Sequence, residues 1–216
     1  NLMKNEFKKR FYSSIILFPI ILFIIIKGSY YFYFLLFSSL FISCYEWNSM
    51  TKNKLYNLIG LLFLLGSFYT FYKFRINSDN NYWNLLIIIL ICILTDIGGY
   101  IFGRILKGPK LIKLSPNKTY SGAIGSFFLT LSSIPFFISY DLVKGNEIFF
   151  TVLFFLLISA ISQTGDIIIS YFKRLSNIKD TGKIIPGHGG LLDRIDGMIF
   201  AIPFFYLVEL TGYLNI

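Results

Sequence analysis

TVLFFLLISAISQTGDIII, residues 151–169, is a mostly apolar stretch that contains one carboxylate, Asp166. A helix needs about 20 predominantly apolar residues to cross a bilayer, and this stretch supplies nearly all of them. A charged side chain inside a span costs a few kcal/mol or more, so such acids usually have a function. The stretch therefore predicts a membrane-spanning helix that carries chemistry.

Apolar blocks of the same kind recur along the 216-residue chain, which is 55% hydrophobic and only 14% charged. Soluble domains are about a quarter charged. We therefore predict an all-α, polytopic integral membrane helical bundle with about seven transmembrane helices. The first two blocks are short, so a helical hairpin is the alternative there. The blocks are 11–26, 30–45, 55–72, 83–102, 120–140, 148–171 and 197–214.

The chain shows no internal repeat and no linker rich in glycine, serine or proline. We therefore expect one continuous membrane domain. Within it, residues 1–82 are predicted to be an N-terminal transmembrane scaffold. Residues 83–216 are predicted to be the catalytic transmembrane region, because they hold nearly all the polar motifs.

Lysines and arginines are unevenly distributed between the two predicted sides of the membrane. With seven spans, sixteen of the 20 basic residues lie on the side of the N-terminus and of segments 46–54, 104–119 and 172–196. Basic loops stay in the cytoplasm, so the polar loops are expected there. The net charge of +9 also favours contact with anionic lipid. Nucleic acid is not expected as a partner, because the sequence offers no soluble basic domain to bind it.

SYFKRLSNIKDTGKIIPGHGGLLDRID, residues 170–196, lies between two apolar blocks and gathers unusual polar chemistry. If the preceding helix continues, Ser170, Lys173 and Arg174 fall on the same face as Asp166. An acid, a hydroxyl and two cations would then line a stripe that leads to the cytoplasm. The alternative is a buried ion pair that only fixes helix packing.

Asp193 and Asp196 are three residues apart at the entry to the last apolar block. On a helix they share a face, and two neighbouring carboxylates repel unless a cation lies between them. Together with Asp166 they would supply the hard oxygen ligands that Mg²⁺ prefers. The alternative is a favourable interaction with a helix dipole. Arg194 is expected to point elsewhere, toward phosphate or another acid.

The segment KDTGKIIPGHGG, residues 179–190, connects the two acidic helices. Its glycines permit tight turns and the close approach of backbone N–H groups to an anion. Lys179 adds a cation. His188 could hydrogen-bond phosphate or merely order the loop.

A second polar turn lies before the block at 120–140. It contains Ser115, Asn117, Lys118 and Thr119. A cationic, hydroxyl-rich turn ahead of a helix suits a polyphosphate. Just upstream, Gly99 and Gly103 form a G-x-x-x-G pattern that predicts close helix packing.

These motifs together resemble the phosphatidate cytidylyltransferase (CDP-diacylglycerol synthase) family over residues 96–196. The resemblance rests on S-x-x-K-R at 170–174, K-D-x-G-x-x-I-P-G-H-G-G-L-x-D-R-I-D at 179–196, G-R at 103–104 and S-P-N-K-T at 115–119. It implies that CTP and phosphatidate react to give CDP-diacylglycerol and pyrophosphate. It also implies Mg²⁺, a second ion such as K⁺, and a homodimer in a bacterial inner membrane with its active site facing the cytoplasm.

The resemblance also implies residue roles. The metal ligands would be Asp166, Asp193 and Asp196. The catalytic residues would be Lys173, Arg174, Lys179, Asp193, Arg194 and Asp196. The substrate-binding residues would be Ser115, Asn117, Lys118, Thr119, Ser170 and His188.

Two other functions would use some of the same features. A CTP-dependent kinase of a polyprenol or phytol would transfer the γ-phosphate and release CDP, but the full motif at 170–196 argues against it. An ion-coupled transporter could use Asp96 and Asp166 as an ion path. That function leaves the glycine-rich cationic loop unexplained.

Overall fold

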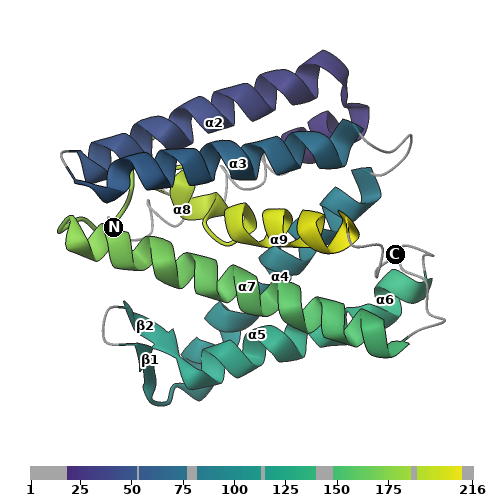
Figure 1. Ribbon diagram of the computed structural model, residues 1–216. Coiled ribbons are helices and arrows are strands. Elements are labelled where there is room, and N and C mark those ends of the chain that lie inside the picture. Colours follow the sequence, from purple (N-terminus) through teal and green to yellow (C-terminus); the bar gives the residue numbers. More distant parts are fainter. Residues whose placement is uncertain are drawn as a thin grey trace. The chain divides into compact units, whose positions relative to one another are not determined.

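The computed structural model describes residues 19–52, 54–76, 82–112, 115–139, 148–185 and 189–210, without the side chains of 115–117. The chain divides into two compact units. Unit 1 comprises Asn1–Tyr82 and Phe172–Asp196, and unit 2 comprises Trp83–Tyr171 and Gly197–Ile216. The described elements are mainly helices (Figure 1).

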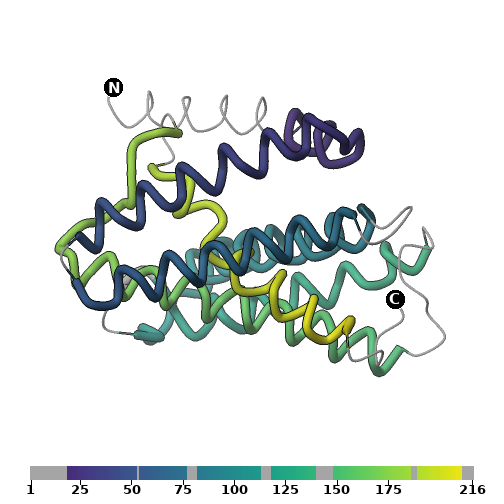
Figure 2. The backbone as a smooth tube through the Cα atoms, turned by 45° about the horizontal axis from the view of Figure 1, so that its top comes forward, coloured from purple at the N-terminus to yellow at the C-terminus, as the bar shows by residue number. Residues whose placement is uncertain are grey.

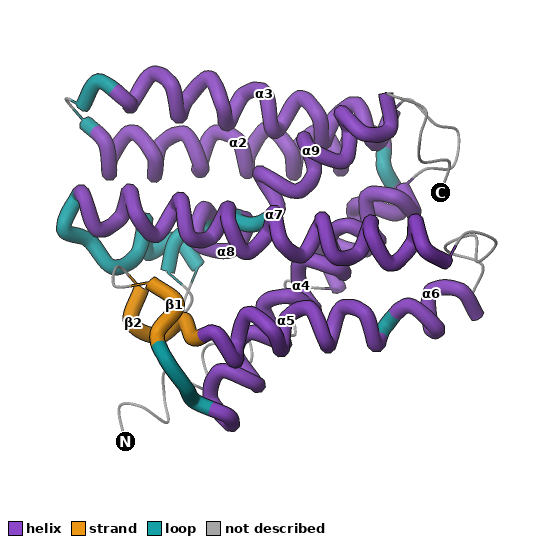
Figure 3. Tube along the Cα trace, turned by 60° about the horizontal axis from the view of Figure 1, so that its bottom comes forward, coloured by secondary structure: helices purple, strands orange, loops and turns teal. Residues whose placement is uncertain are grey.

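Unit 1 is built around two long helices, α2 (Ser29–Thr51) and α3 (Tyr56–Ile76), which lie side by side (Figures 1 and 3). Residues 19–27 are also helical and turn into α2 at Gly28 (Figure 2). Gly28 has a φ of 63°, which favours glycine, and Arg75 hydrogen-bonds the carbonyls of Ile25 and Ile26 beside it. Arg75 therefore satisfies carbonyls at the end of the first helical segment.

Trp47 fixes the end of α2 against its neighbours in unit 1. Its side chain is buried, its Nε1 donates to the backbone oxygen of Asn57 at 3.0 Å, and its ring meets Phe172 edge-on. Gly60 makes room for the indole, since a Cβ there would lie 2.0 Å from the Trp47 ring. This packing fixes the position of the neighbouring residue, Glu46, on α2.

Unit 2 contains most of the other helices and a small hairpin. Its elements are α4 (Tyr82–Leu106), β1 (Lys110–Ile112), β2 (Ser115–Thr119), α5 (Tyr120–Ser132), α6 (Ile134–Ser139), α7 (Ile148–Leu175) and α9 (Met198–Leu210), where α4 begins and α7 ends in residues assigned to unit 1. The strands pair antiparallel, with Lys110 opposite Thr119 and Ile112 opposite Ser115 (Figure 3). The sequence did not predict this hairpin.

Helices α4 and α5 approach closely at their glycines. A Cβ on Gly98 would lie 2.7 Å from the Gly125 carbonyl oxygen. Gly99 and Gly103 both lie against Gly122 of α5. The close packing predicted for the G-x-x-x-G pattern is therefore confirmed. Deeper in unit 2, the buried Thr95 hydroxyl donates to Ser159 at 2.9 Å and links α4 to α7.

Four segments are long and apolar enough to cross a membrane among the residues that the structure describes. They are Tyr56–Ile76, Tyr82–Leu106, Tyr120–Ser139 and Ile148–Leu175. The all-α prediction is confirmed apart from the hairpin, whereas a count of seven spans is not established. The described part of the last block, α9, has only 13 residues, and much of the first block lies outside the described residues.

Candidate active site

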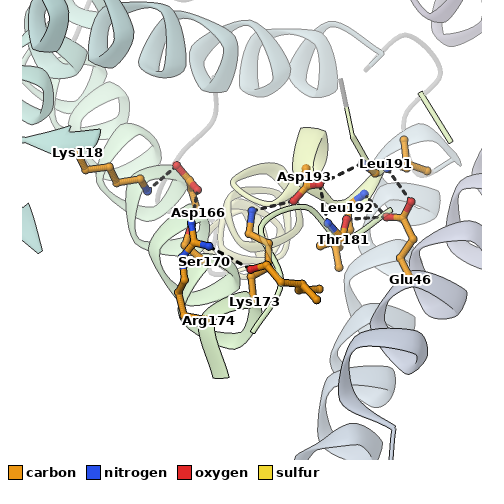
Figure 4. Close-up of polar contacts among 12 residues, drawn as sticks. Glu46, Lys118, Asp166, Ser170, Lys173, Arg174, Thr181, Leu191, Leu192 and Asp193 are labelled. Atoms are coloured by element: carbon orange, nitrogen blue, oxygen red, sulfur yellow. Dashed lines mark hydrogen bonds and ion pairs between the residues drawn. The ribbon is translucent and has the colours of Figure 1, made fainter. Parts of the chain in front are cut away.

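A carboxylate–lysine pair in unit 2 joins the two predicted polar segments. The Lys118 Nζ lies 2.5 Å from Oδ2 of Asp166, and the Ser170 hydroxyl donates to Oδ1 of the same carboxylate at 3.2 Å (Figure 4). Asp166 and Ser170 therefore share a face of α7, as predicted. The side chains of Lys118 and Asp166 retain 23% and 31% of their exposure, so solvent or a ligand can reach the pair.

Thr119 fixes the position of the neighbouring residue, Lys118. The Thr119 side chain caps α5, because its Oγ1 accepts the N–H of Gly122 at 3.1 Å. A threonine cap ends the extended strand and starts the helix at a defined residue. Lys118, the residue before the cap, is thereby held at the end of β2. The Thr119 side chain, which was predicted to bind substrate, therefore caps α5 in the structure.

A second carboxylate–lysine pair lies in unit 1 and is much less exposed. The Lys173 Nζ lies 2.7 Å from Oδ1 of Asp193, and the side chains keep only 11% and 5% of their exposure. Oδ2 of Asp193 accepts the backbone N–H groups of Thr181 at 2.8 Å and Gly190 at 3.1 Å (Figure 4). Both oxygens of Asp193 are therefore engaged within the protein.

Glu46 on α2 is a participant that the sequence analysis missed. Its side chain is 1% exposed, and it accepts hydrogen bonds from the Thr181 hydroxyl and from the N–H groups of Leu191 and Leu192 (Figure 4). The signal was present, because Glu46 directly follows the apolar block at 30–45.

The other predicted cations of unit 1 are more exposed. Arg174 donates to the backbone oxygen of Ile178 at 3.1 Å, and Lys179 and Arg194 are exposed. Asp196 is 7% exposed and directly follows the short helix α8 (Leu192–Ile195), which carries Asp193. The side chains of Ser115 and Asn117, and the whole of His188, lie outside the described residues.

A family model for the cytidylyltransferase family matches residues 56–211, which include both lysine–carboxylate pairs and the loop between α7 and α8. The chain belongs to the cytidylyltransferase family. The matched segment begins after α2, so Glu46 precedes it.

Curated relatives of this cytidylyltransferase family chain extend the match over nearly its whole length. A protein of Rickettsia felis named phosphatidate cytidylyltransferase is 34% identical over 217 residues, covering 96% of this chain and 94% of the relative. One of Rickettsia bellii with the same name is 35% identical, covering 95% and 92%. A third, from Staphylococcus haemolyticus, is 39% identical over 61% of this chain and 50% of the relative.

The carboxylates of this cytidylyltransferase family member have the donor chemistry that a magnesium ion requires. Asp166 and Asp193 present hard oxygen atoms, and each already holds a cation in the form of a lysine ammonium. Among the residues that the structure describes, no three acidic, histidine or cysteine side chains form a group that could hold a metal. Asp166 is the more accessible of the two carboxylates, because its side chain keeps 31% of its exposure and that of Asp193 only 5%.

Proposed function

We propose that this protein transfers the cytidylyl group of CTP to phosphatidate, giving CDP-diacylglycerol and pyrophosphate. The observation that carries this proposal is the similarity to relatives named phosphatidate cytidylyltransferase, which extends over more than nine-tenths of the chain. The partly exposed pair Lys118–Asp166 and the exposed cations Arg174, Lys179 and Arg194 support it, since both substrates carry phosphate groups.

The reaction depends on neutralising phosphate charge and on positioning the two substrates, more than on covalent catalysis. An oxygen of the phosphatidate phosphate attacks the α-phosphorus of CTP and forms a new P–O bond. The bond from the α-phosphorus to the bridging oxygen breaks, and pyrophosphate leaves with those electrons. The nucleophile is already an anion, so the protein needs no strong general base.

Cationic side chains would stabilise the charge that develops on the phosphates. Lys118 can leave Asp166 for a phosphate oxygen at little cost, because a partly exposed ion pair contributes about 0–1 kcal/mol. Arg174, Lys179 and Arg194 are exposed, and we propose that they bind phosphate oxygens of the substrates. Asp193 holds Lys173 in place through a hydrogen bond, so we propose that the Lys173 ammonium stabilises phosphate charge without moving.

We further propose that Mg²⁺ is bound by Asp166, Asp193 and Asp196, with a second ion such as K⁺ nearby. Magnesium would neutralise phosphate charge and polarise the phosphoryl group. Asp166 would exchange the Lys118 ammonium for the ion, and Lys118 would then be available to a substrate phosphate. The residues that we propose to bind substrate are, besides Lys118, Ser115, Asn117, Thr119, Ser170 and His188.

The membrane setting is also part of the proposal. Four apolar helices and bacterial relatives support an integral membrane protein. We place it in a bacterial inner membrane as a homodimer, with the site at the cytoplasmic surface, where the acyl chains of phosphatidate stay in the bilayer. The division into a scaffold at 1–82 and a catalytic region at 83–216 remains a proposal.

The decisive experiment uses purified protein, phosphatidate and CTP labelled on either the α- or the γ-phosphate. Label from the α-phosphate should enter the lipid, and label from the γ-phosphate should appear in pyrophosphate. The reaction should stop when Mg²⁺ is chelated and resume when it is restored. Transfer of γ-label to a lipid alcohol would instead identify a lipid kinase, and CTP-independent ion flux in vesicles would identify a transporter.

A further inference from the structure

Glu46 holds the loop between α7 and α8 from a distant part of the sequence. Its partners Thr181, Leu191 and Leu192 are 135, 145 and 146 residues away along the chain. Oε1 accepts the N–H of Leu191 at 3.0 Å, and Oε2 accepts the N–H of Leu192 at 2.8 Å and the Thr181 hydroxyl at 3.0 Å. One buried carboxylate therefore ties Thr181, in the first half of this loop, to the end of the loop and the start of α8.

Two glycines of the loop leave space for this carboxylate. A Cβ on Gly182 would lie 2.5 Å from Oε1 of Glu46, and its three nearest atoms would all belong to the Glu46 side chain. A Cβ on Gly190 would lie 2.6 Å from Oε2 and 2.1 Å from the Thr181 hydroxyl oxygen. The described glycines at 182 and 190 are thus explained by an internal anion.

Thr181 couples Glu46 to the Asp193–Lys173 pair. The Thr181 hydroxyl donates to Glu46, while its backbone N–H donates to Oδ2 of Asp193. The other oxygen of Asp193 accepts from Lys173. A continuous series of hydrogen bonds therefore runs from Glu46 through Thr181 and Asp193 to Lys173, entirely within unit 1 (Figure 4).

A carboxylate suits this position better than the amide of equal size. All three partners of Glu46 donate hydrogen bonds, and a carboxylate only accepts them. A glutamine would turn an NH₂ group toward at least one N–H or O–H donor. A buried donor without an acceptor is unfavourable, so the loop would shift to avoid it.

We propose that Glu46 is a positioning residue for cytidylyl transfer, an inference that rests on the proposed function. Glu46 does not need to touch either substrate. It holds Thr181 and the start of α8, and through them Asp193 and Lys173, in the arrangement that the reaction uses. Lys179 and Arg194, which are proposed to bind phosphate, lie close in sequence to residues that Glu46 holds: Lys179 precedes Thr181 by two residues, and Arg194 lies in α8.

The first test compares Glu46→Gln, Glu46→Asp and a control, Glu209→Gln, whose glutamate lies on α9 in unit 2. Glu46→Gln should lower kcat/KM for CTP at least tenfold, with a raised KM. Glu46→Asp should restore part of this loss, and Glu209→Gln should match the wild type. A loss of folded protein alone would lower kcat without changing KM. An unchanged KM and a kcat within twofold of the wild type would refute the proposal.

The second test uses the contact between Gly182 and Glu46. Gly182→Ala should lower activity, because the new methyl group would meet the Glu46 side chain. Glu46→Asp withdraws the carboxylate by about 1.5 Å, so the double variant should be more active than Gly182→Ala alone. Failure of Glu46→Asp to improve Gly182→Ala would also overturn the proposal, even if Glu46→Gln does not fold.

A third measurement is independent of activity. Amide hydrogen exchange at Leu191 and Leu192 should be faster in Glu46→Gln than in the wild type, while exchange in α4 stays the same. If wild-type protein fails to transfer the α-label, the proposed function is wrong, but this exchange experiment still tests whether Glu46 holds the loop. Unchanged protection of both amides would contradict the positioning role.

Discussion

Lys118 and Asp166 form a 2.5 Å ion pair in unit 2, and Asp166 accepts a further hydrogen bond from Ser170 on its other oxygen. Both members remain partly exposed. A pair of this kind contributes little to folding but keeps a cation next to a carboxylate. Lys118 can therefore exchange the Asp166 carboxylate for a phosphate group of the substrate.

Lys118→Met should impair catalysis far more than stability. We expect kcat/KM for CTP to fall at least tenfold, and the free energy of unfolding to change by less than about 1 kcal/mol. Lys118→Arg, which keeps the charge, should recover part of the activity. Transfer of the α-label and unfolding in mixed micelles measure the two effects. Full activity in Lys118→Met would remove this lysine from the site.

Lys173→Met should show a large effect on stability as well. The Lys173–Asp193 pair is nearly buried, and removing the lysine leaves a buried carboxylate with only two backbone N–H partners. Breaking a buried pair in this way costs about 3–5 kcal/mol. Unfolding measurements on Lys173→Met and Lys118→Met in the same detergent provide the comparison. Equal stability of the two variants would show that burial of the Asp193 pair has no energetic consequence.

These two pairs also show which contacts of the site could be predicted from the sequence. Helical spacing was enough to place Ser170 beside Asp166, because both lie on one helix. The same spacing did not predict that Lys173 would turn to Asp193, which is 20 residues away. That contact depends on the path of the loop at 176–191, and periodicity carries no information about an irregular path.

Glu46 was missed for a related reason. Its partners lie more than 130 residues away, and nothing in the local sequence around α2 indicates them. The glycines of the loop were predicted to let backbone N–H groups approach a bound anion, whereas Gly182 and Gly190 lie against a carboxylate of the protein itself. The hairpin β1–β2 was missed because its short strands contain few β-branched or aromatic residues.

Gly98→Ala should destabilise unit 2. The new methyl group would lie 2.7 Å from the Gly125 carbonyl oxygen and 2.9 Å from the Cα of Ser126, both of which are backbone atoms that cannot rotate away. Overpacking of this kind costs about 1–3 kcal/mol.

Gly66→Ala on α3 is the matched control for that substitution. A Cβ there meets nothing within 4 Å, so alanine should be neutral or should stabilise the helix by up to about 1 kcal/mol. Thermal unfolding of the two variants in one detergent checks the difference. Equal melting temperatures would contradict the close approach of α4 and α5.

The proposed orientation can be checked with single cysteines at two exposed positions, introduced after Cys44 and Cys92 have been replaced by alanine. Lys183→Cys lies in the loop between α7 and α8, and Ile76→Cys ends α3. An impermeant maleimide should label Lys183→Cys only in inside-out vesicles, because basic loops remain cytoplasmic. It should label Ile76→Cys only in right-side-out vesicles. The reverse pattern would invert the proposed topology.

The fit between Glu46 and Gly182 has a consequence for the evolution of this family. Because a side chain at 182 would occupy the volume of the Glu46 carboxylate, neither position can change freely while the other stays the same. Substitutions at the two sites should therefore be inherited together, although one precedes and the other lies within the segment matched by the family model. A lineage that shortens residue 46 is the one in which a larger residue at 182 becomes tolerable.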